Sequence, residues 1–151
     1  MEIRDKEGNF LAYLAHEMNG ASLSYAQLSG ACLRGVQFEF VFLDDSDLRA
    51  ADLEDSDLDM AVLEAANMQD ANLRGAHLQG ANLRRANLRG TDLSTADLSI
   101  SNIGTSTKLQ GCDLSDAKLE GAVFLGAQYD HSTKFPASFD PIRAGLILKP
   151  E

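Results

Sequence analysis

A large apolar residue recurs at every fifth position through most of this chain. Two residues before each of these positions lies a small or β-branched residue, from Ala21 to Ser101. Most of the intervening residues are polar. The apolar series is Leu23, Leu28, Leu33, Phe38, Leu43, Leu48, Leu53, Leu58, Leu63, Met68, Leu73, Leu78, Leu83, Leu88, Leu93, Leu98 and Ile103.

A period of five excludes both a long helix and a long strand. A helix turns by about 100° per residue, so five residues advance the side chain by roughly 140° and define no apolar face. A strand alternates with a period of two, so Leu23 and Leu28 would lie on opposite faces. A short extended triplet followed by a two-residue corner fits, and corner residues such as Gly30, Gly75 and Asp55 suit turns. The pattern therefore predicts a coiled chain, a solenoid.

Two quintets carry a resemblance to a known family. Ala-Asn-Leu-Arg-Gly at 71–75 and Ala-Asn-Leu-Arg-Arg at 81–85 resemble the repeats of the pentapeptide repeat family, and the resemblance covers roughly residues 16–135. It implies an all-β fold, a right-handed quadrilateral parallel β-helix with four quintets in each coil. Counting centres from Leu23 to Tyr129 gives about 22 quintets, or about 5.5 coils.

The repeat slips out of register twice. The first slip falls in residues 104–108 and the repeat resumes at Leu109, which predicts a single-residue bulge at a corner of a continuous coil. The second slip, in residues 130–134, leads to Phe135 as the last candidate centre.

Caps are expected at both ends, because an open β-helix end exposes apolar side chains and unpaired backbone groups. We predict an N-terminal cap over 1–20, in which Asn9 caps a short helix within 5–17. The β-helix is predicted over 21–135 and a C-terminal cap or tail over 136–151.

The predicted C-terminal cap contains a second short helix. Asp140 is a candidate N-cap, Pro141 occupies the first helical position and Gly145 is a candidate stop. Residues 146–148 would then fold back over the open end. The segment Phe-Pro-x-x-Phe-Asp-Pro at 135–141 also resembles the tails of cyanobacterial members of the family.

Composition narrows the classes of partner. The net charge is −10, from 23 acidic and 13 basic residues. This charge argues against direct binding to nucleic acid or to an anionic membrane surface. There is no apolar run of membrane-spanning length and no apolar secretory segment at the N-terminus, so we expect a cytoplasmic protein.

No catalytic, cofactor or metal site is visible in the sequence. The histidines are isolated from one another, and no Cys or His pair has the spacing of metal ligands. Cys32 falls on an outward position and Cys112 on an inward one, about four coils apart, so we expect two free thiols. The sequence therefore predicts a protein that is not an enzyme and holds no cofactor.

Acidic side chains crowd one predicted coil, where Arg49 is the only basic residue. Because they spread round four faces, they do not converge on one calcium ion. Certain acidic members of the family bind DNA gyrase as rods of DNA-like width, which implies DNA mimicry as an alternative function. Those members generally dimerise through a C-terminal element and some carry projecting loops, neither of which the sequence shows. The acidic residues are Asp44, Asp45, Asp47, Asp52, Glu54, Asp55, Asp57 and Asp59.

The favoured function is a non-catalytic protein–protein interaction module, monomeric or homodimeric, that presents a rigid acidic rod to a protein partner. Outward apolar residues are the informative exceptions on a polar surface. With residues twenty apart stacked, they line one corner, which Gly80 interrupts. The alternative is a few scattered apolar residues, or a misjudged corner with one Phe inward. The candidate interface residues are Phe40, Phe42, Met60, Val62 and Ile100.

Overall fold

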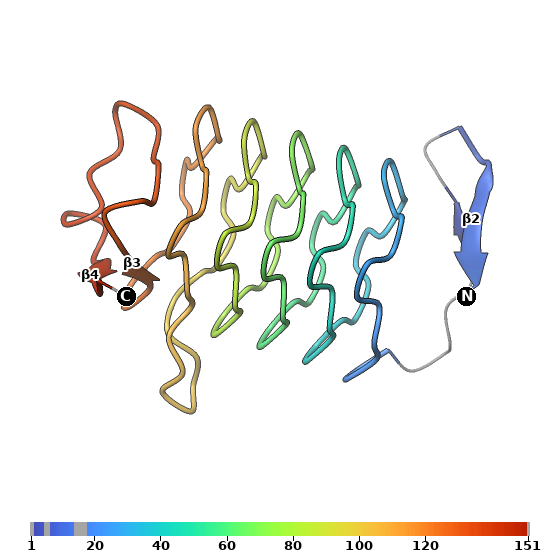
Figure 1. Cartoon of the computed structure of the whole chain (residues 1–151), viewed down its shortest axis with the longest axis horizontal. Coiled ribbons are helices and arrows are strands. Elements are labelled where there is room, and N and C mark those ends of the chain that lie inside the picture. The colour runs from blue at the N-terminus through green and yellow to red at the C-terminus, as the bar shows by residue number, and fades with distance from the viewer. Residues whose placement is uncertain (1, 5–6, 14–17, 151) are drawn as a thin grey trace.

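The protein is a stack of similar coils with its two termini at opposite ends (Figure 1). The structure is a computed structural model that describes residues 2–4, 7–13 and 18–150. Among these residues no helix has the length and apolar composition needed to cross a membrane.

Each coil contains four quintets, because residues twenty apart pair with one another. Asp47 pairs in parallel with both Gln27 and Asn67, and Asn67 pairs in turn with Asn87. Within this ladder the Leu48 amide donates to the Asn67 carbonyl at 2.8 Å. The coil repeat that the resemblance implied is thus present in the backbone hydrogen bonds.

The two-residue corners are tight turns that also bind the next coil. The Ala31 amide donates to the Leu28 carbonyl at 3.0 Å and closes the turn, while the Gly30 amide donates to the Arg49 carbonyl at 2.8 Å. The second corner residue has a left-handed backbone, with φ of 69° at Gly30 and 56° at Asp55. A corner of this kind satisfies backbone groups of its own turn and bonds the turn to the next coil.

The interior is filled by the two inward positions of each quintet. The central apolar residues from Leu28 to Leu98 are buried, and so are the inward alanines from Ala31 to Ala96. Burying one such large side chain stabilises the fold by about 1.5–3 kcal/mol. Two inward hydroxyl groups donate to the backbone, Ser46 Oγ to the Leu43 carbonyl at 2.6 Å and Thr91 Oγ1 to the Met68 carbonyl at 2.9 Å.

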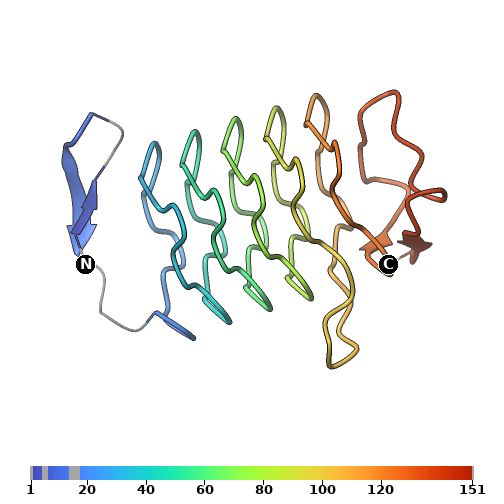
Figure 2. The same cartoon turned by 180° about the vertical axis from the view of Figure 1, so that it is seen from behind.

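The first register slip is a projecting loop, so the predicted single-residue bulge is wrong there. Asn82 pairs with Lys108, whereas the twenty-residue spacing would pair it with Asn102. Six residues are inserted, and the loop extends beyond the row of corners (Figure 2). Ile103 is 73% exposed instead of inward, so the count of about 22 quintets included one that does not contribute to the core.

Short hydrogen bonds close the neck of this loop. The Ser101 amide donates to the Thr105 carbonyl at 2.8 Å, and the Gly104 amide donates back to the Ser101 carbonyl at 2.9 Å. Thr107 Oγ1 accepts from the Gly80 amide at 2.9 Å. This hydroxyl replaces the carbonyl of the next coil that receives the equivalent amide at other corners.

The second slip is the single-residue insertion that the sequence predicts. Asp113 pairs with Lys134, one residue beyond the regular spacing. The extra residue is accommodated around Asp130, whose Oδ1 accepts hydrogen bonds from Gly111, Ser132 and Thr133. Burial opposes the charged form of this carboxyl, but these hydrogen bonds outweigh it and lower the pKa of Asp130 to about 2.

The N-terminal segment is a hairpin, so the predicted helix is wrong for the described residues. Strand β1 (Glu2–Arg4) pairs antiparallel with β2 (Phe10–Tyr13). The Arg4 carbonyl accepts from the Cys32 amide at 2.7 Å, and Ile3 is buried in the core cluster. A strand can bond to the open end of the ladder, which a helix cannot do. The remainder of the predicted helix, residues 14–17, lies outside the described residues.

The C-terminal segment makes one helical turn and then a short strand. Asp140 Oδ1 accepts from the Ile142 and Arg143 amides at 3.0 and 3.1 Å, so the predicted cap is present. The turn ends at Gly145, which has φ of 81°, before an α-helix forms, so the predicted helix is wrong. Too few residues separate the cap from the stop.

After this turn the chain continues the ladder. Strand β4 (Ile147–Leu148) pairs in parallel with β3 (Gln128–Tyr129). Leu146 is buried, whereas Ile147 and Leu148 are 46% and 42% exposed. Of the three residues expected to cover the end, Leu146 alone does so fully.

Candidate protein-interaction surface

The predicted apolar residues lie on the outside, along one corner of the coils. We call Phe40, Met60 and Ile100, with the adjacent Phe42 and Val62, the apolar corner. Phe40 and Phe42 are 47% and 46% exposed, and Phe42 pairs directly with Val62 of the next coil. The alternative that one Phe points inward is wrong, because Phe38 and Val41 occupy the inward positions.

Gly80 does not interrupt the apolar corner. A Cβ on Gly80 would lie 2.5 Å from Met60 Sδ, so the Met60 side chain already covers this position. In the same way Ile100 covers Gly126, where an added Cβ would lie 3.2 Å from Ile100 Cβ. Corner side chains thus lean over the corner glycine of the next coil, and the apolar surface continues past Gly80.

The backbone at this corner is unfavourable for the residues that occupy it. Phe40 and Met60 have φ of 58° and 60°, the left-handed region that glycine adopts most easily. A larger residue there costs roughly 1–2 kcal/mol. Because the Phe40 side chain is about half exposed, the free energy gained by its burial offsets only part of this backbone strain.

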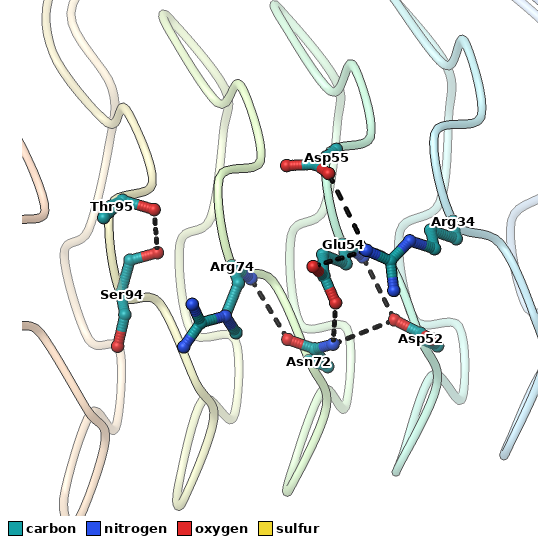
Figure 3. A network of polar contacts seen from close by, with 8 residues as sticks. All are labelled: Arg34, Asp52, Glu54, Asp55, Asn72, Arg74, Ser94 and Thr95. Carbon is teal, nitrogen blue, oxygen red and sulfur yellow. Dashed lines mark hydrogen bonds and ion pairs between the residues drawn. The ribbon is translucent and has the colours of Figure 1, made fainter.

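The acidic residues that the sequence places together on one coil have hydrogen-bond and ion-pair partners on neighbouring coils. Arg34 Nη2 lies 2.6 Å from Glu54 Oε1 and 4.0 Å from Asp55 Oδ2. Asn72 Nδ2 donates to Asp52 Oδ1 and Glu54 Oε2, each at 3.0 Å (Figure 3). Arg49 is the only basic residue of this coil, as the sequence shows, but partners twenty residues away also stack beside its carboxylates.

Other carboxylates of this coil are paired more locally. Arg49 Nη2 lies 2.6 Å from Asp47 Oδ2, and the hydrogen bond from Arg49 lowers the pKa of Asp47. Ser24 Oγ donates to Asp44 Oδ1 at 2.6 Å. Asp45 is exposed at the rim of an open depression that Val62 also lines.

A different face of the coils carries acidic residues and one histidine, His77, but no Lys or Arg. We call the outward residues of the quintets centred on Phe38, Leu58, Leu78, Leu98 and Phe124 the acidic face. Its carboxylates accept hydrogen bonds from the backbone, as where Asp59 Oδ1 accepts from the Gln79 amide at 2.8 Å. The outward residues are Gln37, Glu39, Asp57, Asp59, His77, Gln79, Asp97, Ser99, Val123 and Leu125, with Phe40, Met60, Gly80, Ile100 and Gly126 at the corner.

The pKa of Asp59 is shifted by its neighbours on the acidic face. Partial burial raises its pKa, and repulsion from Asp57 and Asp97 acts in the same direction. The hydrogen bond from Gln79 and the proximity of His77 oppose these effects but do not outweigh them. Sequence reasoning named Asp57 and Asp59 but missed Glu39 and Asp97, which stacking at twenty residues places on the same face.

The two cysteines lie as predicted, with Cys32 exposed and Cys112 buried, and both are free. Cys112 Sγ donates to the Leu83 carbonyl at 2.7 Å, and burial raises the pKa of this thiol. Within residues 2–4, 7–13 and 18–150, no group of three or more His, Cys, Asp or Glu side chains is arranged to hold a metal ion.

Comparison with solved structures finds several repeat proteins. A pentapeptide repeat protein of Nostoc PCC 7120, alr5209, is 35% identical over 68% of this chain and 84% of its own, with a TM-score of 0.47. HetL of the same organism, involved in heterocyst differentiation regulation, is 34% identical over 74% and 59%, with a TM-score of 0.35. QnrB1, a plasmid-mediated fluoroquinolone resistance protein, is 22% identical over 85% and 79%, with a TM-score of 0.44. A search of curated proteins gave no match.

The family model for pentapeptide repeats matches in eight copies, over residues 17–39, 31–70, 66–102 and 105–128. Proteins of this family adopt a right-handed quadrilateral β-helix and are generally non-catalytic structural or interaction modules. The gap between the last two matched segments coincides with the projecting loop. The chain belongs to the pentapeptide repeat family.

Proposed function

We propose that this protein is a non-catalytic interaction module that docks a protein partner on its apolar corner. The observation that carries the proposal is the apolar row of the exposed Phe40 and Ile100 and the half-buried Met60, flanked by the exposed Phe42. Aromatic side chains in such a position are the residues that typically dominate the binding energy of interfaces.

The fold supports this role because its stability resides in the interior. Backbone ladders and inward leucines repeat without regard to the outward residues. The outward side chains are therefore available for recognition on a stiff scaffold, which lowers the entropy lost on binding. Phe40 contributes little to the stability of the fold, because its backbone is left-handed and its side chain is half exposed.

The test compares two double variants in pull-downs from cell extract and in light scattering. Phe40→Ser with Phe42→Ser removes both aromatic side chains of the apolar corner. Arg74→Ser with Arg89→Ser removes two exposed side chains of other faces and serves as the control. We expect the first variant to fold as the parent does and to lose the partner or self-association, while the control retains it. Unchanged partners and unchanged mass in the first variant would contradict the proposal.

The second candidate function is a DNA-mimicking binder of DNA gyrase. It is favoured by the net charge of −10 and by the projecting loop, a feature of some gyrase-binding members of the family. The pairing of Glu54, Asp47 and Asp92 with basic side chains weighs against it, because DNA presents an unbroken series of negative charges. A gyrase supercoiling assay, with and without a quinolone, separates the two functions. Inhibition or protection at micromolar protein would favour the mimic.

A further inference from the structure

We infer that the partner segment combines large apolar side chains with lysine or arginine, and that the acidic face receives its basic groups. The inference rests on the proposed function, since it assigns chemistry to a partner of the apolar corner. It is carried by the absence of Lys and Arg from the outward positions of the acidic face and by the position of that face beside the apolar corner.

Four carboxylates of the acidic face lack a cationic partner. Among the described residues, the ion pairs of the stack involve Asp47, Glu54, Asp55, Glu64, Asp92, Asp113 and Asp116. Glu39, Asp57, Asp59 and Asp97 are in none of them. The Asp57 and Asp97 carboxylates accept from the Asp59 and Ser99 amides. Backbone amides compensate part of the charge of Asp57, Asp59 and Asp97 and leave a net negative potential.

The apolar and acidic surfaces run side by side along the stack. In one coil the chain passes from Asp57 and Asp59 to Met60 and then Val62. In the preceding coil it passes from Glu39 to Phe40 and Phe42. Because the coils are in register, two parallel stripes result, one negative and one apolar. A segment lying along the stack would meet apolar contacts on one side and carboxylates on the other.

The projecting loop extends the apolar stripe. It begins at Ile100 and presents Ile103, which is 73% exposed. A Cβ on Gly80 would lie 3.3 Å from both Ser101 Cβ and the Thr105 carbonyl oxygen, so the loop stands against the apolar corner. The hydrogen bonds at its neck hold Ile103 in place for contact with the same segment.

Charge decides between the possible occupants. A second copy of this chain would bring its own net charge of −10 toward the acidic face, and a nucleic acid would bring phosphates. Both meet repulsion, whereas Lys or Arg side chains gain favourable contacts and faster association. A basic, apolar protein segment is therefore the occupant that fits both stripes.

The probe is a fluorescent 18-residue helical peptide of leucine and lysine, with binding followed by anisotropy. The acidic-face variant combines Glu39→Gln, Asp57→Asn, Asp59→Asn and Asp97→Asn, which keep an acceptor oxygen for the backbone amides. The control combines Asp55→Asn, Asp70→Asn, Asp116→Asn and Glu120→Gln on other faces. Each variant changes the net charge from −10 to −6, so non-specific attraction falls equally in both.

We expect the acidic-face variant to bind the peptide about ten-fold more weakly than the parent and the control to stay within about two-fold. A peptide with glutamate in place of lysine, and one with serine in place of leucine, should each bind more weakly than the probe. An equal loss in both variants would overturn the inference, because it would show attraction to net charge alone. Circular dichroism melts check that both variants fold.

Pull-downs of the same variants separate this inference from the proposed function. If Phe40→Ser with Phe42→Ser loses the partner but the acidic-face variant keeps it, the assigned chemistry is wrong and the docking site stands. If both variants keep the partner, the docking site and the chemistry both fall. Loss in both, with retention by the control, supports the two together.

Discussion

Two faces of this rod share a backbone and an interior but differ in how they treat charge. The outward residues of the quintets centred on Leu33, Leu53, Leu73 and Leu93 form what we call the paired face. There, Arg34 pairs with Glu54, and Asn72 donates to the Asp52 and Glu54 carboxylates of the preceding coil (Figure 3). The acidic face carries no Lys or Arg on its outward positions. The fold therefore does not dictate the outward charge of either face.

The difference bears on function because ion pairs at the surface contribute little to stability. An exposed pair such as Arg34–Glu54 is worth about 0–1 kcal/mol. The stack can thus form with or without such pairs, as the acidic face demonstrates. Under the proposed function, the unpaired carboxylates beside the apolar row are the groups that a basic partner would neutralise.

The largest expected effect tests whether the interiors behind the two faces are equivalent. Leu73 lies behind the paired face and Leu78 behind the acidic face, and both are fully buried. Replacing either with Ala should lower the free energy of unfolding by about 2–5 kcal/mol, through lost burial and a cavity. Denaturant melts measure both. A melt unchanged from the parent in either variant would show that its leucine is not a core residue.

A smaller effect distinguishes the corners of the two faces. Gly75→Ala and Gly80→Ala both strain a left-handed backbone, at roughly 1–2 kcal/mol. An added Cβ on Gly75 meets the exposed Asp55 carboxylate, which can swing into solvent, whereas on Gly80 it meets Met60 and the loop backbone. Gly80→Ala should therefore cost more than Gly75→Ala in the same melts. Equal costs would mean that Met60 does not pack over Gly80.

The sequence predicts the interior that lies behind both faces. A period of five fixes which residues are inward, because the corners leave two inward positions in each quintet. The loop was missed because Ile103 still fits the period, although Asn102 and Gly104 beside it favour a turn. The partners of Glu54 and Asp52 are not visible in the sequence of their own coil, because Arg34 and Asn72 lie twenty residues away and meet them only when the coils stack.

The N-terminal hairpin could not be read from the sequence for a different reason. Phe10–Tyr13 fits one side of a short helix as well as a strand, and the choice depends on the open ladder that the Arg4 carbonyl contacts. At the candidate site, the spacing of outward apolar residues in the sequence predicts the apolar corner. The acidic face needed the structure, since it is defined by what the four carboxylates fail to contact.

The effect of an ionised carboxylate on the free energy of unfolding should have opposite signs on the two faces. Burial opposes ionisation of Asp92, on the paired face, but hydrogen bonds from Ser94 and the Lys118 charge outweigh it and lower its pKa. Its contribution is present above the unfolded value of about 3.9 and is lost as the pH falls through its lower folded pKa. The pKa of Asp59 is raised, so its charge destabilises the fold at neutral pH and protonation relieves this as the pH falls toward about 4.

Melts at pH 7 of Asp92→Asn and Asp59→Asn test these signs. We expect Asp92→Asn to destabilise and Asp59→Asn to be neutral or stabilising, each by less than about 1 kcal/mol. A control melt near pH 3 should bring both variants closer to the parent. Destabilisation by Asp59→Asn at pH 7 to the same extent as by Asp92→Asn would contradict the assigned difference.

The smallest effect concerns salt. Moderate salt should raise the melting temperature by screening repulsion among the carboxylates. Asp57→Asn should reduce this response more than Asp55→Asn does, because Asp55 lies 4.0 Å from the Arg34 guanidinium and Asp57 has no such partner. Thermal melts at low and moderate salt compare the two variants. A melting temperature of the parent protein that does not depend on salt would show that repulsion among the carboxylates does not lower stability.

The central claim is that a protein partner docks on the apolar corner beside the acidic face. The most direct measurement places a photo-crosslinking phenylalanine analogue at Phe42 in one variant and at Arg74, on the paired face, in another, followed by irradiation in cells. The account predicts a discrete adduct from position 42 and none from position 74, with the adduct lost when the four acidic-face carboxylates are neutralised. An adduct from position 74 with none from position 42 would contradict it.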